Sequence, residues 1–187
     1  MILTGQEIRR QVEDGKIEIT PFYLKQINPA SYDLRLGDKY LTYAPRYAVV
    51  PSRWLLDSKS ENLVEEHLIY PDGVTLEPGT LYLMHTTEII HTNQFVSVID
   101  GKSSLARLGI VTHLTAGYGD PGFRGQYTLE VSVVHPVRVY AGMRFCQIRF
   151  HTVQGERIQY RGNYTGEAAM GPVASRSWKQ FKEKADE

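Results

Sequence analysis

Most of the side chains that could do chemistry lie in one stretch, GKSSLARLGIVTHLTAGYGDPGFRGQYTLE, which runs from Gly101 to Glu130. The stretch contains adjacent serines, basic residues, a histidine and two carboxylates, together with many glycines. Serine and basic groups bind anions, carboxylates act as general bases, and glycines let a backbone approach a ligand closely. Because apolar strand-like segments flank this stretch, we interpret it as a candidate binding or catalytic site.

The first part of the stretch, around Ser103 and Ser104, is a candidate phosphate site. The segment SLARLG is typical of a single helical turn, and a serine cap with exposed N–H groups at a helix start binds anions. A P-loop is excluded, because that motif needs a glycine where the sequence has Val96. The alternative is an ordinary capped turn without a ligand, and the residues alone leave both interpretations open.

Two carboxylates lie in the second part of the stretch. Asp120 is in YGDPGFRG, a glycine-dense turn where the backbone could approach a ligand. Glu130 is inside QYTLEVSVV, where alternation places it with Thr128 and Ser132 on the face opposite the apolar side chains. A carboxylate in mid-strand is disfavoured unless its face is wet or its charge is paired. Glu130 is therefore either a solvent-facing strand residue or a general base with a tuned pKa.

Metal catalysis and serine hydrolysis have little support in this sequence. The six histidines lie at 67, 85, 91, 113, 135 and 151, no two of them within four residues, and Cys146 is the single cysteine. The H-x-E…P-C-x-x-C pattern of zinc deaminases and the G-x-S-x-G elbow of serine hydrolases are both missing. We therefore expect no zinc and no metal held by the protein. We also expect His85 and His91 to be surface or edge-strand residues.

The elements that position this stretch are predicted to be mostly β-strands. Strand-like segments recur as SYDLRLG, VTLEPGTLYLMHTTEII, QFVSVID, QYTLEVSVV and VRVYAGMRFCQIRF. The second of these contains a turn at 77–79, and the last is typical of a hairpin through Ala141-Gly142 with a bulge between Phe145 and Ile148. Many short strands with few helices indicate an all-β sandwich or barrel.

Three further segments complete the chain. Thr4 and Glu7 fit a capping box, and Gly15 is expected to end a short amphipathic helix. Residues 44–73 show no sustained period and are predicted to be a long surface excursion. After Tyr160 the glycine-rich and then charged tail is either a flap that ends in a short helix or a frayed terminus.

The composition excludes several classes of protein. A chain of 187 residues suits a single domain with a sizeable core. Lys+Arg and Asp+Glu are 21 each, so no bulk positive charge attracts nucleic acid. No apolar run approaches the roughly 20 residues that span a bilayer, and the first residues lack the apolar core of a signal peptide. With a single cysteine, the sequence predicts a soluble cytoplasmic protein without nucleic-acid or membrane partners.

Long segments of the chain resemble the dCTP deaminase family, which belongs to the trimeric dUTPase superfamily. GKSSLARLGIVTH and TAGYGDPGFRGQYTLE carry the resemblance, and PASYDLRLG, LEPGTLYL and GPVASR match in the same order. The resemblance implies a mostly β fold, a distorted β-barrel of the dUTPase-like type with a short N-terminal helix and a C-terminal flap. It places the barrel at residues 1–160 and a tail that closes over the nucleotide site at 161–187. It also implies a homotrimer with active sites where subunits meet.

The resemblance further assigns roles to residues. Glu130 is implied as the base that activates water for attack on cytosine C4, with Arg107 and Ser103 as polar partners near the base ring and the water. Asp120 matches the carboxylate with which dUTPase relatives activate water against the α-phosphate. Mg²⁺ is expected on the triphosphate of the nucleotide, without zinc. The implied nucleotide-binding residues are Lys102, Ser103, Ser104, Arg107, Thr115, Ala116, Gly117, Asp120 and Tyr164.

Three departures from the family pattern refine these expectations. Relatives that only deaminate tend to have a histidine in place of Gly117, whereas bifunctional relatives that release dUMP have a glycine there. Gly119 replaces the isoleucine that is usual before the aspartate, which predicts a looser strand and a displaced Asp120. In the tail, Asn163 and Glu167 stand where the family has a lysine and a glutamine that reach phosphates.

The expected function is hydrolytic deamination of dCTP at cytosine C4, coupled to triphosphate hydrolysis that gives dUMP and diphosphate. This reaction would supply dUMP for dTMP synthesis. Two alternatives stay open. One is a dUTP or dCTP pyrophosphatase without deamination. The other is a non-catalytic nucleotide-sensing trimer, against which the presence of Glu130, Arg107 and Asp120 argues.

Overall fold

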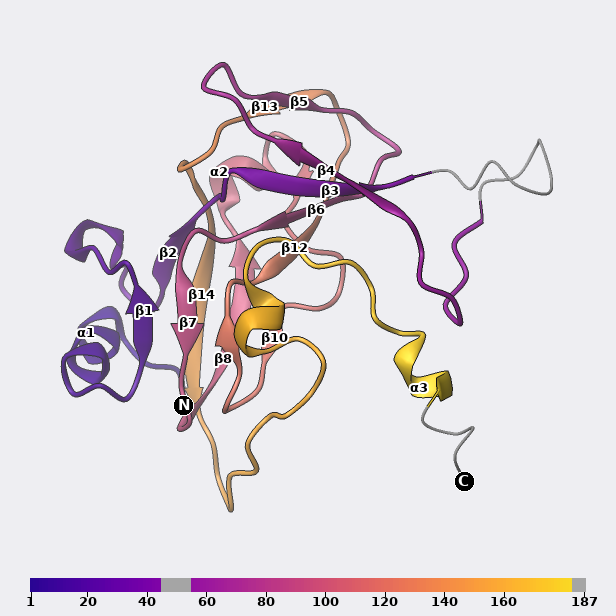
Figure 1. The fold of residues 1–187 in the computed structure, drawn as a ribbon. Coiled ribbons are helices and arrows are strands. Elements are labelled where there is room, and N and C mark those ends of the chain that lie inside the picture. Colours follow the sequence, from indigo (N-terminus) through magenta and orange to yellow (C-terminus); the bar gives the residue numbers. More distant parts are fainter. Residues whose placement is uncertain (45–54, 183–187) are drawn as a thin grey trace.

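The computed structural model describes residues 1–44 and 55–182, and Figure 1 shows that strands dominate them. The helical elements are α1 (Gly5–Glu13), η1 (Leu24–Gln26), α2 (Ser103–Ala106), η2 (Gly166–Ala169) and α3 (Lys179–Lys182). The strands are β1 (Glu18–Thr20), β2 (Tyr32–Arg35), β3 (Lys39–Tyr43), β4 (Val64–Leu68), β5 (Val74–Leu76), β6 (Tyr82–His85), β7 (Ile89–His91), β8 (Phe95–Gly101), β9 (Ile110–Val111), β10 (Tyr118–Gly119), β11 (Arg124–Gly125), β12 (Thr128–Val133), β13 (Val137–Val139) and β14 (Arg144–Thr152). The predicted mostly β fold with a short N-terminal helix is confirmed.

The strands pair into four sheets around one apolar core. The two larger sheets have the strand orders β10-β8-β14-β2 and β4-β3-β6-β12-β9, and the smaller ones β1-β7-β11 and β13-β5. Both larger sheets contribute buried side chains to the same core cluster, among them Ile148 on β14 and Val131 on β12. Among the described residues the sheet orders do not close, so the predicted barrel is distorted rather than a continuous ladder.

Helix α1 begins and ends as its sequence predicts. The Thr4 side chain accepts a hydrogen bond from the Glu7 N–H at 3.3 Å, and Gly15 after the helix has a φ of 69°. A left-handed residue is cheap only for glycine, so the chain turns there and continues into β1. Ile8 is fully buried and anchors the helix to the core. Figure 1 places this helix to one side of the sheets, away from the tail.

Strand β12 has the alternation that the sequence predicts. Leu129 and Val131 are at most 1% exposed, whereas Thr128 and Ser132 on the opposite face are half-buried. Strand β2 departs from this pattern, because Asp33 is buried together with its apolar neighbours. The Asp33 carboxylate pairs with Lys102 Nζ at 2.5 Å and with Arg144 Nη1 at 3.5 Å, which compensates its loss of water.

The prediction of a surface excursion over residues 44–73 is wrong for part of that range. Residues Val64–Leu68 form β4, which pairs antiparallel with β3 and contributes an edge strand to the five-stranded sheet. The sequence VEEHL carries three polar residues in five, so its pattern gives no period-2 signal. The part of the prediction that concerns residues 45–54 lies outside the described residues.

Two hairpins expected from the sequence contain the predicted strands, but the two strands of each expected hairpin pair with other strands. The turn at 77–79 is confirmed, with Gly79 at a φ of 82°, but β5 pairs with β13 and β6 pairs with β12 and β3. The expected hairpin through Ala141-Gly142 is wrong for the same reason, because β13 pairs with β5 and β14 pairs with β2 and β8. A bulge is present, but its register shift lies between Arg144 and Cys146, at the start of the predicted range of 145–148, and Cys146 to Ile148 pair in regular register.

The expectation for the two histidines is also wrong. His85 is 4% exposed on β6 in the interior of the five-stranded sheet, and His91 lies on β7, the middle strand of its sheet. A side chain on Gly37 would overlap the His85 ring, so Gly37 provides the space in which this histidine is buried. Burial lowers the pKa of His85, which keeps the ring neutral in the core.

Candidate active site

A pocket of about 480 Å³ lies between β6, β10, β12 and the C-terminal tail. Figure 1 shows the tail, in yellow, crossing in front of β12 and β10. Among the described lining residues the charged side chains are Asp120 and Glu130, and aromatic rings and backbone turns make up much of the rest. Of the residues predicted to form the site, the pocket contains Thr115, Ala116, Asp120, Glu130 and Tyr164.

Glu130 is the carboxylate of β12 that faces this pocket. Its backbone pairs with Leu83 on β6, and its side-chain Oε2 is buried without a hydrogen-bond partner in the described part of the chain. Burial raises the pKa of Glu130, and a bond to its own backbone N–H and the nearby His113 offset part of that rise. An unpaired carboxylate in a pocket can accept a proton from water, as a general base must. These features favour the general base over the solvent-facing strand residue.

The raised pKa of Glu130 makes its carboxylate a source of instability at neutral pH. The unfolded chain loses the Glu130 proton near the ordinary value of 4.5, whereas the folded chain loses it at higher pH. The carboxyl group therefore costs no stability below the unfolded pKa, and its full cost is reached above the folded pKa. We expect Glu130→Gln to raise the midpoint of thermal unfolding at neutral pH and this gain to shrink as the pH falls toward 4.5. A gain that stays constant with pH, measured by circular dichroism, would contradict the assignment.

Asp120 lies at the edge of the pocket in a tight turn. It follows β10 directly, and its carbonyl accepts a hydrogen bond from the Phe123 N–H at 3.1 Å. The prediction that Gly119 loosens this strand is wrong, because Gly119 is buried and pairs with Ser97 on β8. The volume that a side chain at 119 would need is already filled by Tyr127. Strand β10, which directly precedes Asp120, is therefore well packed.

The turn that contains Ser103 and Ser104 lies outside the pocket. Helix α2 is the expected single turn, but the expected serine cap is wrong, because its N-cap is Lys102 and no side chain caps it. Both serines and Arg107 are exposed, and the Arg107 Nη1 donates to the Ser103 carbonyl at 3.0 Å. Lys102 Nζ is bound to the buried Asp33. The predicted phosphate turn is therefore formed, but one chain does not bring it to Glu130.

Gly117 is beside the pocket rather than part of its lining, and its lack of a side chain has a clear cause. A Cβ there would lie 2.7 Å from both His113 Nε2 and the Ile99 carbonyl oxygen. The Gly117 carbonyl also accepts a hydrogen bond from the Ile99 N–H at 2.7 Å. Glycine therefore allows the 113–117 loop to lie close to β8, which places Thr115 and Ala116 in the pocket.

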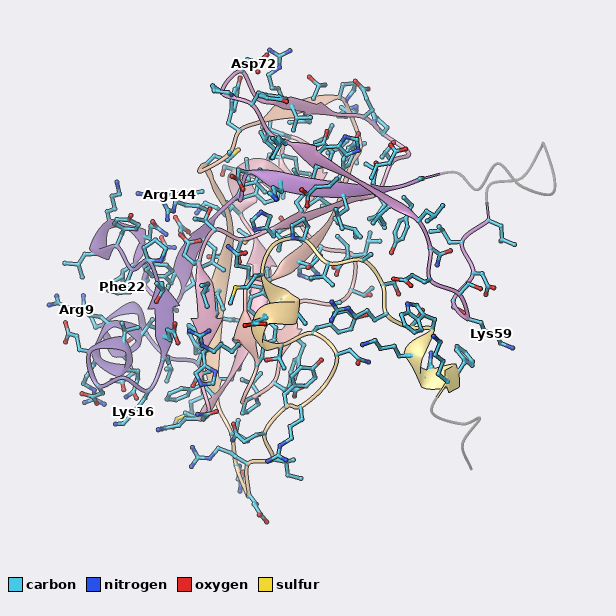
Figure 2. The ribbon with its side chains drawn as sticks, in the orientation of Figure 1. Arg9, Lys16, Phe22, Lys59, Asp72 and Arg144 are labelled. Atoms are coloured by element: carbon cyan, nitrogen blue, oxygen red, sulfur yellow. The ribbon has the colours of Figure 1, made fainter. Side chains whose placement is uncertain are left out.

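The C-terminal tail packs against the open side of the pocket. Gly171 N–H donates to Gln126 Oε1 at 2.6 Å, and Val173 N–H donates to Thr128 Oγ1 at 3.1 Å. The short helix expected at the end is α3, and Figure 2 shows Lys59 beside it, where the Lys59 ammonium lies over the Phe181 ring. The tail is thus bound to the body of the chain by specific contacts, which a frayed terminus lacks.

Within the tail, Tyr164 lines the pocket and its hydroxyl accepts the Arg176 N–H at 2.7 Å. Asn163 and Glu167 are exposed and lie outside the pocket lining. The side chains that hold the tail are Thr128 at the start of β12, which shares the face of Glu130, and Gln126, for which the sequence carries no signal. Tyr127, Tyr160 and Tyr43 also line the pocket, although no sequence motif indicates them as site residues. Their only sequence signal is the tyrosine content of the chain, 12 residues, and this does not locate them.

The residues described by the structure contain no group of three or more His, Cys, Asp or Glu side chains placed to hold a metal ion. The expectation that the protein holds no zinc is not tested by this observation and stays a prediction. Similarly, none of the described helices has the length and apolar character needed to cross a bilayer.

A mostly β scaffold with a buried carboxylate that has no partner in the described chain, in a pocket of about 480 Å³, is typical of an enzyme that acts on a small molecule. Comparison with known proteins identifies the family within this class of enzymes. The profile of the family described as dCTP deaminase-like matches residues 2–153. The chain therefore belongs to the dCTP deaminase family.

Individual relatives agree with this family. A Leptospira biflexa protein named dCTP deaminase, dUMP-forming, is 44% identical over 98% of this chain and 100% of its own length. A protein of the same name from Clostridium acetobutylicum is 41% identical over 92% of this chain and 95% of its own. The solved structure of 2'-deoxycytidine 5'-triphosphate deaminase from Agrobacterium tumefaciens aligns with a TM-score of 0.62 and 28% identity. That alignment covers 81% of this chain and 48% of the Agrobacterium chain.

Proposed function

We propose that this protein deaminates dCTP at cytosine C4 and hydrolyses the triphosphate, so that it releases dUMP and diphosphate. The observation that carries the proposal is the unpaired, half-buried Glu130 carboxylate in the pocket. Gly117, which the close approach to Ile99 requires, supports the bifunctional reaction, as do relatives named dUMP-forming. The alternative of a pyrophosphatase without deamination is disfavoured, because it leaves Glu130 without a role.

In the deamination step Glu130 acts on a water molecule held over cytosine C4. The carboxylate takes a proton from the water while the water oxygen bonds to C4 and the electrons of the C4=N3 bond move to N3. That proton then passes to the exocyclic amine, the bond between C4 and the amine nitrogen breaks, and ammonia leaves. The second proton of the water moves from the C4 hydroxyl to N3, so that the C4 carbonyl of uracil forms. The raised pKa of Glu130 makes it a stronger base than an ordinary glutamate, which favours the first proton transfer.

In the second step Asp120 is proposed to take a proton from a water molecule that attacks the α-phosphate. The bond between the α-phosphorus and the bridging oxygen breaks, which releases diphosphate and leaves dUMP. Mg²⁺ enters with the triphosphate as part of the substrate, because the pocket itself supplies two carboxylates and needs the nucleotide charge to be shielded. Tail residues 161–187 are proposed to close over the bound nucleotide as a lid on the barrel of residues 1–160.

The charges of the pocket support a site shared between copies of this chain in a homotrimer. The charged residues in the described lining, Asp120 and Glu130, would repel a triphosphate, whereas Arg107 and the Ser103–Ser104 turn are exposed outside the pocket. We propose that the turn of one copy completes the pocket of its neighbour. Cyclic symmetry allows this, since a head-to-tail interface joins two different surfaces of the same chain.

Mixing two inactive variants tests the shared site. We expect Glu130→Gln and Arg107→Ala each to lose activity, and the population of trimers that forms when both variants are co-expressed in equal amounts to regain about a quarter of it. A quarter follows because a site works only when one neighbour supplies an intact Glu130 and the other an intact Arg107. Mixed proteins that stay inactive, or a monomeric mass by sedimentation at full activity, would place the whole site in one chain.

One product assay separates the candidate functions. The protein is incubated with dCTP and Mg²⁺, and dUTP, dUMP, dCMP and diphosphate are resolved by chromatography. Formation of dUMP with diphosphate supports the proposal, dCMP identifies a pyrophosphatase, and absence of turnover identifies a nucleotide-sensing trimer. The expected site of action is the cytoplasm, in agreement with a single, buried Cys146.

A further inference from the structure

Gly119 and Tyr127 both line the pocket, and a side chain at position 119 would need the volume that Tyr127 occupies. A methyl group on Gly119 would overlap the Tyr127 hydroxyl and would lie 2.5 Å from Ser97 Oγ. Ser97 and Tyr127 are 2% and 6% exposed, so neither side chain has solvent to move into. The Tyr127 phenol therefore stands where a side chain at 119 would otherwise be.

The Tyr127 hydroxyl is connected to the strand that carries Asp120. It lies 2.5 Å from Ser97 Oγ, and Ser97 Oγ donates to the Gly119 carbonyl at 3.3 Å. Since that bond uses the single Ser97 proton, the Tyr127 hydroxyl must be the donor to Ser97. Gly119 also pairs with Ser97 across β10 and β8. These contacts together fix the residue immediately before Asp120.

Tyr127 is itself held firmly from the other side. Its N–H donates to Thr86 Oγ1 at 2.9 Å, and its carbonyl accepts from the Thr86 N–H at 3.0 Å. The ring packs against Phe123 with 4.7 Å between centroids. Burial raises the pKa of Tyr127, and the charge of Asp120 adds to the rise, so the hydroxyl remains a donor at all physiological pH values.

We propose that Tyr127 is a positioning residue for Asp120, and that it acts through Ser97 and Gly119. The inference rests on the proposed second step, in which Asp120 activates water against the α-phosphate. A general base must lie within about 3 Å of the proton it takes. Displacement by about 1 Å can cost roughly 10²-fold in rate, so the packing behind Gly119 sets the efficiency of that step.

Tyr127→Phe tests this by removing the hydroxyl while keeping the ring on Phe123. With dUTP as substrate and Mg²⁺ present, we expect kcat to fall up to about 10²-fold with little change in KM, because the base is displaced rather than the nucleotide. With dCTP as substrate, the ratio of dUTP to dUMP should rise. Tyr82→Phe is the matched control, because it also removes a buried hydroxyl, one that accepts the Glu77 N–H at 2.8 Å and belongs to a residue outside the pocket lining. It should leave the ratio unchanged.

Two further variants keep the test decisive if Tyr127→Phe is unstable. Ser97→Ala should shift the ratio in the same direction. Gly119→Ala should shift it more, and adding Tyr127→Phe to Gly119→Ala should relieve part of the defect, because the oxygen that overlaps the new methyl group is gone while the 2.5 Å approach to Ser97 Oγ remains. If Tyr127→Phe and Ser97→Ala both keep the wild-type ratio of dUTP to dUMP, the positioning role of Tyr127 is wrong, while the proposed second step still stands. A wild-type protein that releases only dUTP would contradict the proposed second step and the inference with it.

Discussion

Glu130→Gln is expected to abolish the formation of both dUTP and dUMP from dCTP. Glutamine keeps the shape of the side chain but cannot take a proton from water, so attack on C4 loses its base. Loss of a general base typically costs about 10² to 10⁴-fold, which an end-point assay of the nucleotides detects. Glu130 Oε2 has no hydrogen-bond partner in the described chain, so it can accept a hydrogen bond from the water that attacks C4.

A surface glutamate on another strand provides the control. Glu66 lies on β4 and pairs with Lys39 Nζ at 3.0 Å, well exposed and outside the pocket. Glu66→Gln makes the same chemical change and should leave turnover intact. If Glu130→Gln still forms uracil nucleotides at the wild-type rate, Glu130 is not the base and the deamination mechanism is wrong.

Asp120→Asn is expected to let dUTP accumulate while deamination continues. The two steps act at C4 of the ring and at the α-phosphate, which lie several ångströms apart along the nucleotide. A base that must be within about 3 Å of its proton cannot serve both places, so the second carboxylate carries the second step. We expect the conversion of dUTP to dUMP to fall by about 10² to 10⁴-fold, measured by chromatography with dUTP as the added substrate.

Asp72→Asn is the matched control for this change. Asp72 is exposed in the turn between β4 and β5 and, as Figure 2 shows, lies at the periphery of the molecule. It should give the wild-type ratio of dUMP to dUTP. Continued dUMP formation by Asp120→Asn would assign the second step to another group. Release of dUTP by the wild-type protein would identify a simple deaminase.

Local patterns in the sequence determined much of the secondary structure. The Thr4 cap on the Glu7 N–H and the alternation of β12 depend on neighbours a few residues away, and both are confirmed. The Glu7 carboxylate, which a full capping box would direct to the Thr4 N–H, instead accepts from Arg10 and Gln11. Strand β4 escaped notice because an edge strand with one face in water can carry polar residues at successive positions. Period-2 alternation of apolar residues therefore fails to predict a strand where burial of one face does not require that alternation.

The sequence also singled out the candidate catalytic carboxylates, because charge inside an apolar strand and an aspartate among glycines are unusual in any context. It could not show that Glu130 Oε2 is buried and unpaired, since burial depends on β6 and the tail, which are distant in sequence. Nor could it show that the turn with Arg107 lies outside the pocket of its own chain.

The pairing of strands and the fit of Gly119 were decided by tertiary structure alone. Turns at 77–79 and 141–142 predict a reversal of the chain, but β5 and β13 pair with each other because the two strands meet in space, not because a tight turn joins them. Gly119 read by itself predicts a loose strand, whereas the Tyr127 ring fills the space that the missing side chain leaves. The sequence by itself determined where strands, turns and reactive groups occur, because these depend on adjacent residues. Only the folded chain decided which of them touch, because close packing couples residues that are far apart along the chain.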